Sequence, residues 1–283
     1  MPARILYVGQ EVKIVTAGGL TRYLPVQSAS CEVTRPIEDV LSFGRLGSLG
    51  RVQNAVSTCK ADIKSYVPNV TGIGGSANNI INAAFLQGLT GESLAGSNSV
   101  ITVSPNGFTM SGIVTSIGFD ISEGSFATAD FSFAGVGEPL FASAPTGVGF
   151  SQQSNMPSSF TPVTSTSVDG QITGGCVNSF KFSLDIPTES ITCLGGTVSG
   201  TQPEVASSFT QVAKPPFKAT ISLEGTAVDT PAQLNSAFTL GKLDIALPAA
   251  QITSRSFNNA VGNVGGTYNY TIEDVSCTFT DNP

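Results

Sequence analysis

The chain contains no histidine and no tryptophan. Without histidine it cannot build a Ser-His-Asp or Cys-His relay, imidazole acid-base catalysis or a histidine-containing zinc site. The lack of tryptophan and the presence of only 5 tyrosines also count against the aromatic platforms of a carbohydrate-binding module. We therefore expect a protein that is not an enzyme and that needs no cofactor or metal.

Charged residues are also few. Charged residues make up 12% of the 283 residues, whereas hydrophobic residues make up 40%. A soluble monomer normally carries more charge, so we expect other copies of the chain to cover much of the surface. The net charge is −7, and no two Lys or Arg residues are adjacent. Specific or tight binding to nucleic acid is therefore not expected, and an acidic surface would instead repel phosphates.

Paired cysteines and long apolar runs are also missing. The cysteine count is 5, an odd number without a Cys-x-x-Cys motif, which indicates buried free thiols in a reducing cytosol. No apolar stretch reaches about 18 residues, and no secretory signal is recognised after Met1, so we expect no membrane partner. The cysteines are Cys31, Cys59, Cys176, Cys193 and Cys277.

Most of the chain alternates apolar with polar residues between clusters of Ser, Thr, Gly, Asn and Pro, which is typical of β-strands. Short helices are expected over Ser76–Leu86 and Thr230–Phe238 because each opens with a capping residue. A mid-strand change of phase around Asp130 and Phe131 predicts a β-bulge. The fold class is therefore all-β with short flanking helices.

An internal repeat is the most informative feature of the sequence. Residues 26–28 match residues 177–179 at a separation of 151, and Pro36 and Glu38 match Pro187 and Glu189. After an insertion, residues 59–63 match residues 217–221, and later 126–132 match 270–276. The repeat predicts tandem domains at 1–138, including an N-terminal arm, and at 176–283, joined by a linker or extended loop at 139–175. One large β sandwich with similar strands is the alternative.

The segment from Gln27 to Tyr66 holds a strand, a long Gly-rich loop over residues 35–53 and a second strand, and Val177–Leu223 repeats this layout. It resembles the tail tube (major tail) proteins of tailed bacteriophages, which are related to type VI secretion tubes and baseplate hubs. The resemblance covers nearly the whole chain but rests on layout. It implies two tandem tube-like β sandwiches or barrels.

The resemblance also implies a function. Tube proteins stack as hexameric or pseudo-hexameric rings around a channel that conducts DNA during ejection, without specific DNA binding. We favour three two-domain chains per ring over six chains, because both halves keep the ring-forming elements. The expected place is the virion tail, assembled in the host cytoplasm, with sheath, baseplate and tail terminator proteins as possible partners. The sequence does not identify the carboxylates that would line an acidic channel. Several acidic residues lie near expected loops and strand ends, and an ordinary solvated carboxylate is the favoured interpretation of each: Glu38, Asp39, Asp120, Asp130, Glu189 and Asp274.

The two long Gly-rich loops, at 36–54 and 187–208, are candidate contacts between stacked rings, with a mobile exposed loop as the alternative. The candidate contact residues are Leu41, Phe43, Arg45, Leu46, Leu49, Arg51, Ile191, Leu194 and Val198.

Other functions remain open at this point. The chain could be another component of the virion or injection machine, such as a baseplate hub, tail terminator or capsid decoration protein. It could also be a β-sandwich binding module. Catalysis has little support, because adjacent carboxylates such as Glu273 and Asp274 point to opposite faces of a strand.

Overall fold

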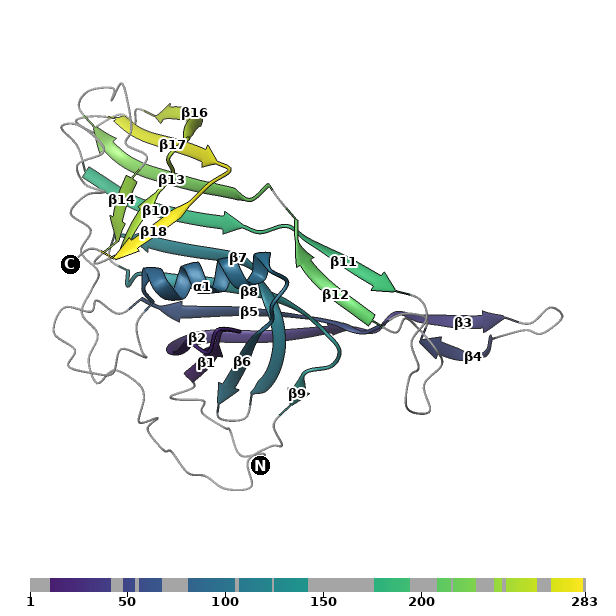
Figure 1. Cartoon of the computed structure of the whole chain (residues 1–283). Helices are drawn as coiled ribbons and strands as arrows, with labels where there is room; N and C mark the ends of the chain where they lie inside the picture. Colours follow the sequence, from purple (N-terminus) through teal and green to yellow (C-terminus); the bar gives the residue numbers. More distant parts are fainter. Residues whose placement is uncertain are drawn as a thin grey trace, which may run out of the picture.

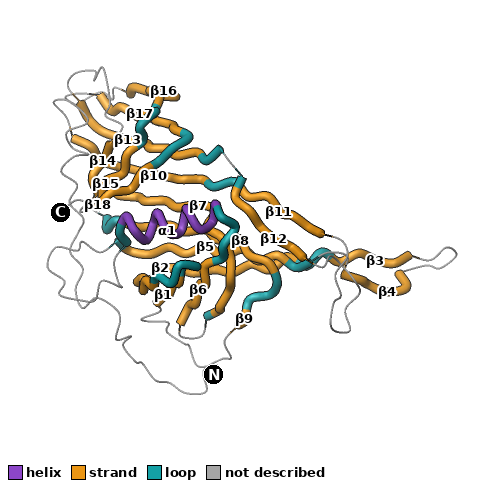
Figure 2. Tube along the Cα trace, in the orientation of Figure 1, coloured by secondary structure: helices purple, strands orange, loops and turns teal. Residues whose placement is uncertain are grey.

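Alternating sequence builds almost the whole structure, a computed structural model in which strands dominate (Figures 1 and 2). It describes residues 11–41, 48–53, 56–67, 81–104, 107–123, 125–141, 176–193, 208–214, 216–227, 237–240, 243–258 and 266–281. The elements before residue 142 are β1 (Glu11–Val15), β2 (Thr21–Thr34), β3 (Ile37–Leu41), β4 (Ser48–Gln53), β5 (Thr58–Tyr66), α1 (Ala83–Leu94), β6 (Ser99–Ser104), β7 (Phe108–Ser122), β8 (Thr128–Val136) and β9 (Leu140–Phe141).

The elements after residue 175 are again strands in the described part of the chain. They are β10 (Cys176–Asp185), β11 (Thr188–Cys193), β12 (Ser208–Ala213), β13 (Lys218–Ala227), β14 (Ala237–Leu240), β15 (Leu243–Ala246), β16 (Gln251–Asn258), β17 (Gly266–Asp274) and β18 (Thr278–Asp281). The expected mostly β fold is confirmed at this level.

The main sheet closes on itself in one part and stays open in another. Strands β7, β6, β1, β2, β5 and β8 pair in that order, and β8 pairs again with β7, so they form an antiparallel barrel. From β7 the sheet continues through β10, β13, β17 and β16. All of these pairings are antiparallel. The result is a barrel with a sheet extending from one of its strands.

Strand β7 makes this arrangement possible because it divides one of its edges between two partners. Residues 109–112 pair with β6 inside the barrel, and residues 116–122 pair with β10. A bulge between Val114 and Ser116, seen in the pairing with β8, lies at the point of division. The backbone N–H of Val114 there donates to Oγ of Ser93 in α1 at 2.9 Å, and the contact is buried.

Helix α1 begins at Ala83, later than the expected start at Ser76, and continues to Leu94. Residues 76–80 lie outside the described residues. The side chain of Asn82 caps the helix by accepting a hydrogen bond from the Phe85 N–H at 3.0 Å. Phe85 is fully buried and its ring meets Phe131 of β8 edge to face, with centroids 6.4 Å apart. The helix therefore covers the core face of the sheet.

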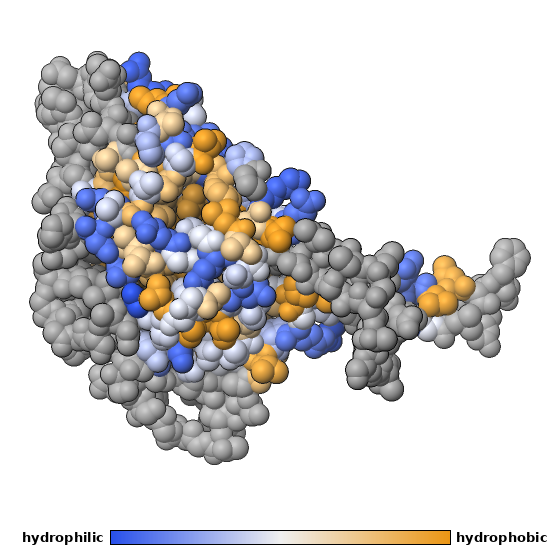
Figure 3. All heavy atoms as spheres, in the orientation of Figure 1, coloured by the Kyte–Doolittle hydropathy of each residue, from blue (hydrophilic) through white to orange (hydrophobic). Residues whose placement is uncertain are grey.

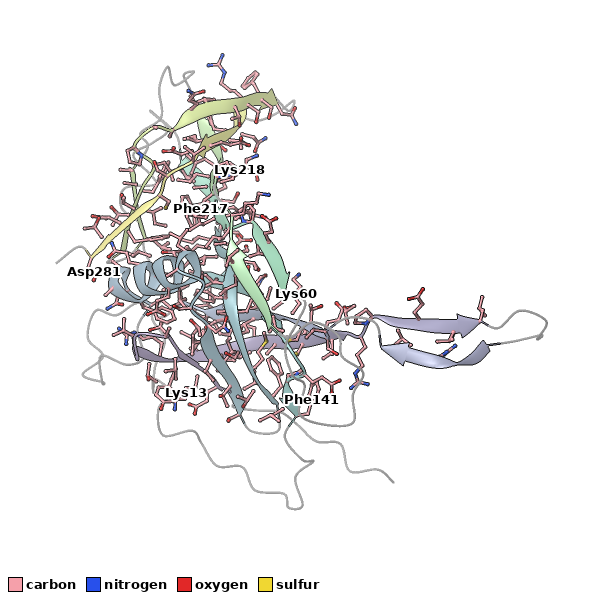
Figure 4. The ribbon with its side chains drawn as sticks, turned by 45° about the vertical axis from the view of Figure 1, so that its right-hand side comes forward. Lys13, Lys60, Phe141, Phe217, Lys218 and Asp281 are labelled. Carbon is pink, nitrogen blue, oxygen red and sulfur yellow. The ribbon has the colours of Figure 1, made fainter. Side chains whose placement is uncertain are left out.

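Strand β18 of a small sheet, β14–β15–β18, lies beside the start of α1 (Figure 1). Oδ1 of Asp281 accepts a hydrogen bond from the Ala83 N–H at 2.8 Å, and Gln87 donates to the Phe279 carbonyl at 2.6 Å. Figure 4 shows Asp281 beside the start of the helix. The last described strand thus stabilises a helix that lies far away in the sequence.

Two predictions about elements were wrong in the described residues. Phe238, expected at the end of a helix, lies in strand β14, where Phe238 and Leu240 are buried and Phe238 pairs with Ile245. Residues 230–236 of that predicted helix lie outside the described residues. Leu140 and Phe141, expected in a linker, form β9, which pairs with the start of β7. The rest of the predicted linker, 142–175, also lies outside the described residues.

We predict that Asn82→Ala lowers the free energy of unfolding by about 1 kcal/mol, as losing an N-cap does in other proteins. The variant removes the acceptor for the Phe85 N–H and for Nη2 of Arg22, which donates to Asn82 at 3.3 Å. Equilibrium unfolding in urea measures the change. Asn82→Asp keeps the acceptor and is the control; an equal loss in both variants would show that the cap is not responsible.

Candidate assembly surface

The extended sheet has one polar face. On β5, Ala61 and Ile63 are buried in the core. Lys60, Asp62 and Lys64 alternate with them and therefore lie on the opposite face. The paired positions of the neighbouring strands carry further charged residues on this face: Glu32, Asp120, Asp130, Lys181, Asp185, Lys218, Glu224 and Glu273. Carboxylates outnumber lysines here, so the face is acidic.

Each lysine of the polar face lies beside a carboxylate. Ion pairs join Lys60 to Asp62 (3.3 Å), Lys181 to Asp120 (3.5 Å) and Lys218 to Glu273 (2.9 Å). Lys64 lies directly opposite Asp130 in the β5–β8 ladder. Exposed ion pairs add little stability, so their main effect is on the field outside the sheet. In the sequence, the only signal for this polar face is the alternation of Lys60, Asp62 and Lys64 with apolar residues.

Asp130 lies near a shallow hollow at one end of this face. Burial raises the pKa of Asp130; Lys64 lowers it and Asp120 raises it further. The rings of Tyr66 and Phe126 meet edge to face in the hollow with centroids 6.0 Å apart. The hollow has a volume of about 370 Å³ and is lined by Gln27, Lys64, Tyr66, Asp120, Ser122, Ser125, Phe126 and Thr128.

The sheet ends in a free edge on each side, within the described residues. Strand β16 pairs only with β17, and all its residues from Gln251 to Asn258 are exposed. At the other end, residues 21–25 of β2 pair with β1, whereas residues 26–34 pair only with β5 on the opposite side. Unpaired N–H and C=O groups along such edges are templates for another strand.

Two hairpins replace the predicted long loops. Figure 1 shows β3–β4 projecting from the body as an arm, and β11–β12 extending from β10 beside the body. Figure 3 shows hydrophobic residues on the described part of the projecting arm. Arg35 at its base forms a two-pronged ion pair with Glu138, Nε to Oε1 at 2.6 Å and Nη2 to Oε2 at 2.8 Å. Because Glu138 lies between β8 and β9, this pair links the arm to the barrel.

Four of the candidate ring-contact residues lie in the described part of the chain. Leu41 ends β3 and is 75% exposed. Arg51 lies on β4, is exposed, and forms a 2.9 Å ion pair with Asp39. Leu49 lies on β4 and Ile191 on β11. Thus the described candidates lie on the two hairpins. Phe43, Arg45, Leu46, Leu194 and Val198 lie outside the described residues.

The six acidic residues expected near loops and strand ends lie in three places. Asp120 and Asp130 lie on the polar face, whereas Glu38, Asp39 and Glu189 lie on the hairpins. Asp274 is buried on the core side and accepts hydrogen bonds from the N–H groups of Ala249 (2.7 Å) and Ser276 (3.1 Å). Burial alone would raise the pKa of Asp274, but these backbone bonds hold it below its usual range. It therefore anchors a turn.

The thiols whose side chains are described, Cys31, Cys59 and Cys277, are free. Burial raises the pKa of Cys277 to about 12, so this thiol is unreactive at neutral pH. Among the described residues, no cluster of three His, Cys, Asp or Glu side chains could hold a metal ion. No described helix is both long and apolar enough to span a membrane.

The surface thus combines a main sheet that has an acidic polar face and two free strand edges with two hairpins that form separate two-stranded sheets. No protein-family model matches the chain, and no curated protein sequence matches it.

Proposed function

We propose that the chain is a structural subunit of a bacteriophage tail tube, with two tandem β units that form rings stacked around a DNA-conducting channel. One observation carries the proposal: the sheet β2-β5-β8-β7-β10-β13-β17-β16 is acidic on one face and has a free edge at each end. In the proposed ring, this sheet would form an arc of a larger cylinder. Joining the edges of several copies would remove every free edge.

The order of elements supports two equivalent units. A long strand, a hairpin and a second long strand occur first as β2, β3–β4 and β5, and again as β10, β11–β12 and β13. In the first series α1 comes next, and residues 228–236, at the corresponding place in the second series, lie outside the described residues. Each series then has a short strand (β6 or β14), a long strand (β7, or β15 with β16), a further long strand (β8 or β17) and a final short one (β9 or β18). The units would be fused through the pairing of β7 with β10.

The positions of the β-bulges provide an independent way to align the two units. The β2–β5 ladder is irregular between Val26 and Ser28, and the β10–β13 ladder between Val177 and Ser179. These positions are 151 residues apart, the separation that the sequence repeat predicts. The β7–β8 ladder is irregular between Val114 and Ser116, and the β16–β17 ladder between Ile252 and Ser254. Equivalent bulges on equivalent strands favour duplication over a single sandwich with similar strands.

The pairing of β7 with β10 inside the chain predicts how β16 of one copy would pair with β2 of the next. This junction between copies is called the seam. Within the chain, Phe119 of β7 pairs with Phe182 of β10, three residues after Ser116 and Ser179 respectively. Three residues after the equivalent Ser254 and Ser28 come Phe257 of β16 and Cys31 of β2. In the ring we therefore expect Phe257 of one copy opposite Cys31 of the next. Three copies would complete a pseudo-sixfold cylinder.

The acidic face would line the channel, because α1 and the small sheet cover the other face. Its lysines already have carboxylate partners, so none is left to hold a DNA phosphate firmly. The remaining carboxylates repel the DNA backbone, which keeps the duplex moving. The location in a virion tail, and contacts with sheath, baseplate and terminator proteins, are part of the same proposal.

Electron microscopy of the purified protein tests the assembly. We expect hollow six-lobed rings that stack into tubes, with a mass of three chains per ring by mass photometry. Rings that never stack would instead indicate a baseplate hub or tail terminator. A chain that stays monomeric at every concentration tested would contradict ring formation.

The register of the seam has its own test. Phe257→Cys should form a disulfide with the native Cys31 of the next copy, because paired residues on neighbouring strands lie within disulfide range. Non-reducing gels should show chains linked up to a trimer, and reductant should return them to monomers. Ser256→Cys, which lies on the opposite face of β16, is the matched control. Cross-linking that survives Cys31→Ser would refute the proposed register.

The proposed role of the acidic face is tested by removing the carboxylates that pair with its lysines. In the variant Asp62→Asn, Asp120→Asn, Glu273→Gln, three lysines lose their ion-pair partners. We expect its rings to bind double-stranded DNA, more weakly as salt rises, while wild-type rings do not. Fluorescence anisotropy measures the binding. The control, Glu38→Gln, Asp39→Asn, Glu189→Gln, makes the same charge change on the hairpins; equal binding by both variants would contradict a channel role for the polar face.

A further inference from the structure

Five of the exposed large hydrophobic residues of the first half lie on two elements, β3 and β9. On β3, Ile37 is 56%, Val40 43% and Leu41 75% exposed; on β9, Leu140 is 76% and Phe141 63% exposed. An isolated two-stranded hairpin is marginally stable in water, and exposed apolar groups of this size indicate a contact surface. These five residues are called the seam residues below. Figure 4 shows Phe141 at the outside of the body.

The second half contains equivalents of both elements, and in the chain both lie against the first half. Strand β9 begins four residues after β8 ends, and β18 begins four residues after β17 ends. The strand pairings make Gly135 the equivalent of Asp274. In the first half Gly135 aligns through β5 with Val33, and in the second half Asp274 aligns through β13 with Leu184, which lies 151 residues after Val33. Leu140 is therefore the equivalent of Phe279. Phe279 is 3% exposed, whereas Leu140 is 76% exposed.

Both equivalents contact the other half of the same chain, and the Phe279 ring also meets the Phe182 ring of its own half edge to face, with centroids 6.0 Å apart. Strand β18 lies against α1, with the hydrogen bonds from Gln87 to the Phe279 carbonyl and from Ala83 to Asp281. Strand β12 of the second hairpin lies beside β7, β8 and α1. Thus both elements of the second half reach across the β7–β10 junction onto the first half.

We infer that the seam residues make the corresponding contact across the junction between copies: they pack on the second half of the neighbouring chain in the same ring. The partner is a second copy of this chain, at the side of its β16 and β17 strands. The Arg35–Glu138 ion pair would hold the arm and β9 in a fixed relation at their common base. This inference rests on the proposed ring and assigns the described part of the arm, including Leu41, to contacts within a ring instead of between rings.

The test is the double variant Leu41→Ser, Leu140→Ser. Both side chains are largely exposed in the single chain, so the unfolding temperature of the monomer should not change. Burial of two leucines in the ring would be lost, so the concentration needed for half-assembly should rise roughly tenfold or more. Sedimentation velocity across a dilution series measures this concentration. Leu41→Met, Leu140→Met keeps the apolar surface and should assemble like wild type.

A matched control uses Leu94→Ser, a leucine that is 44% exposed at the end of α1, away from the proposed seam. It should leave assembly unchanged. A Leu41→Ser, Leu140→Ser variant that forms rings at the wild-type concentration would overturn the inference. If the tubes of that variant were also shorter, the arm would contact the next ring instead. A serine variant that fails to fold would also overturn it, because the seam residues would then support the monomer. Failure of the proposed function is separate: wild-type chains would form no ring, and Phe257→Cys chains would form no disulfide with Cys31.

Discussion

The division of one edge of β7 between β6 and β10 is the constraint on which the rest of the structure depends. Residues 109–112 close the barrel, and residues 116–122 begin the open sheet. A slip of one residue would turn Phe119 away from Phe182, whose ring centroid lies 5.9 Å away, and bring Asp120 into the core. The bulge at Val114 allows the change of partner, and Ser93 satisfies the N–H group that it leaves.

Much of the fold could be predicted because alternation and local turn signals depend on neighbouring residues alone. Details that depend on a partner strand could not. The predicted bulge in β8 is instead in its partner β7, and β8 runs regularly with Phe131 and Phe133 buried. The sequence match of Cys59 with Phe217 slips by two residues, since the ladders equate Cys59 with Ala219. The match of residues 126–132 with 270–276 slips by five, since the ladders equate Gly135 and not Asp130 with Asp274. Sparse identities cannot define a hydrogen-bond register.

The candidate surface was less accessible to prediction. Leu41 and Arg51 were predicted in a long Gly-rich loop, whereas both lie on the paired hairpin β3–β4. The free edge of β16 could not be found, because whether a strand lies at an edge depends on topology and not on its own residues. Similarly, Asp120 and Asp274 look alike in the sequence. One faces Lys181 on the polar side, and the other holds a buried turn.

The junction between β7 and β10 has a kinetic consequence. Because it joins two segments of one polypeptide, it forms without a collision between molecules, at the high effective concentration of a tethered pair. In a ring of identical fused units, half of the junctions would already exist before any two chains meet. Only the remaining half would cost translational entropy. Ring closure would then have fewer incomplete intermediates, and fewer chains with exposed sheet edges would be present at one time.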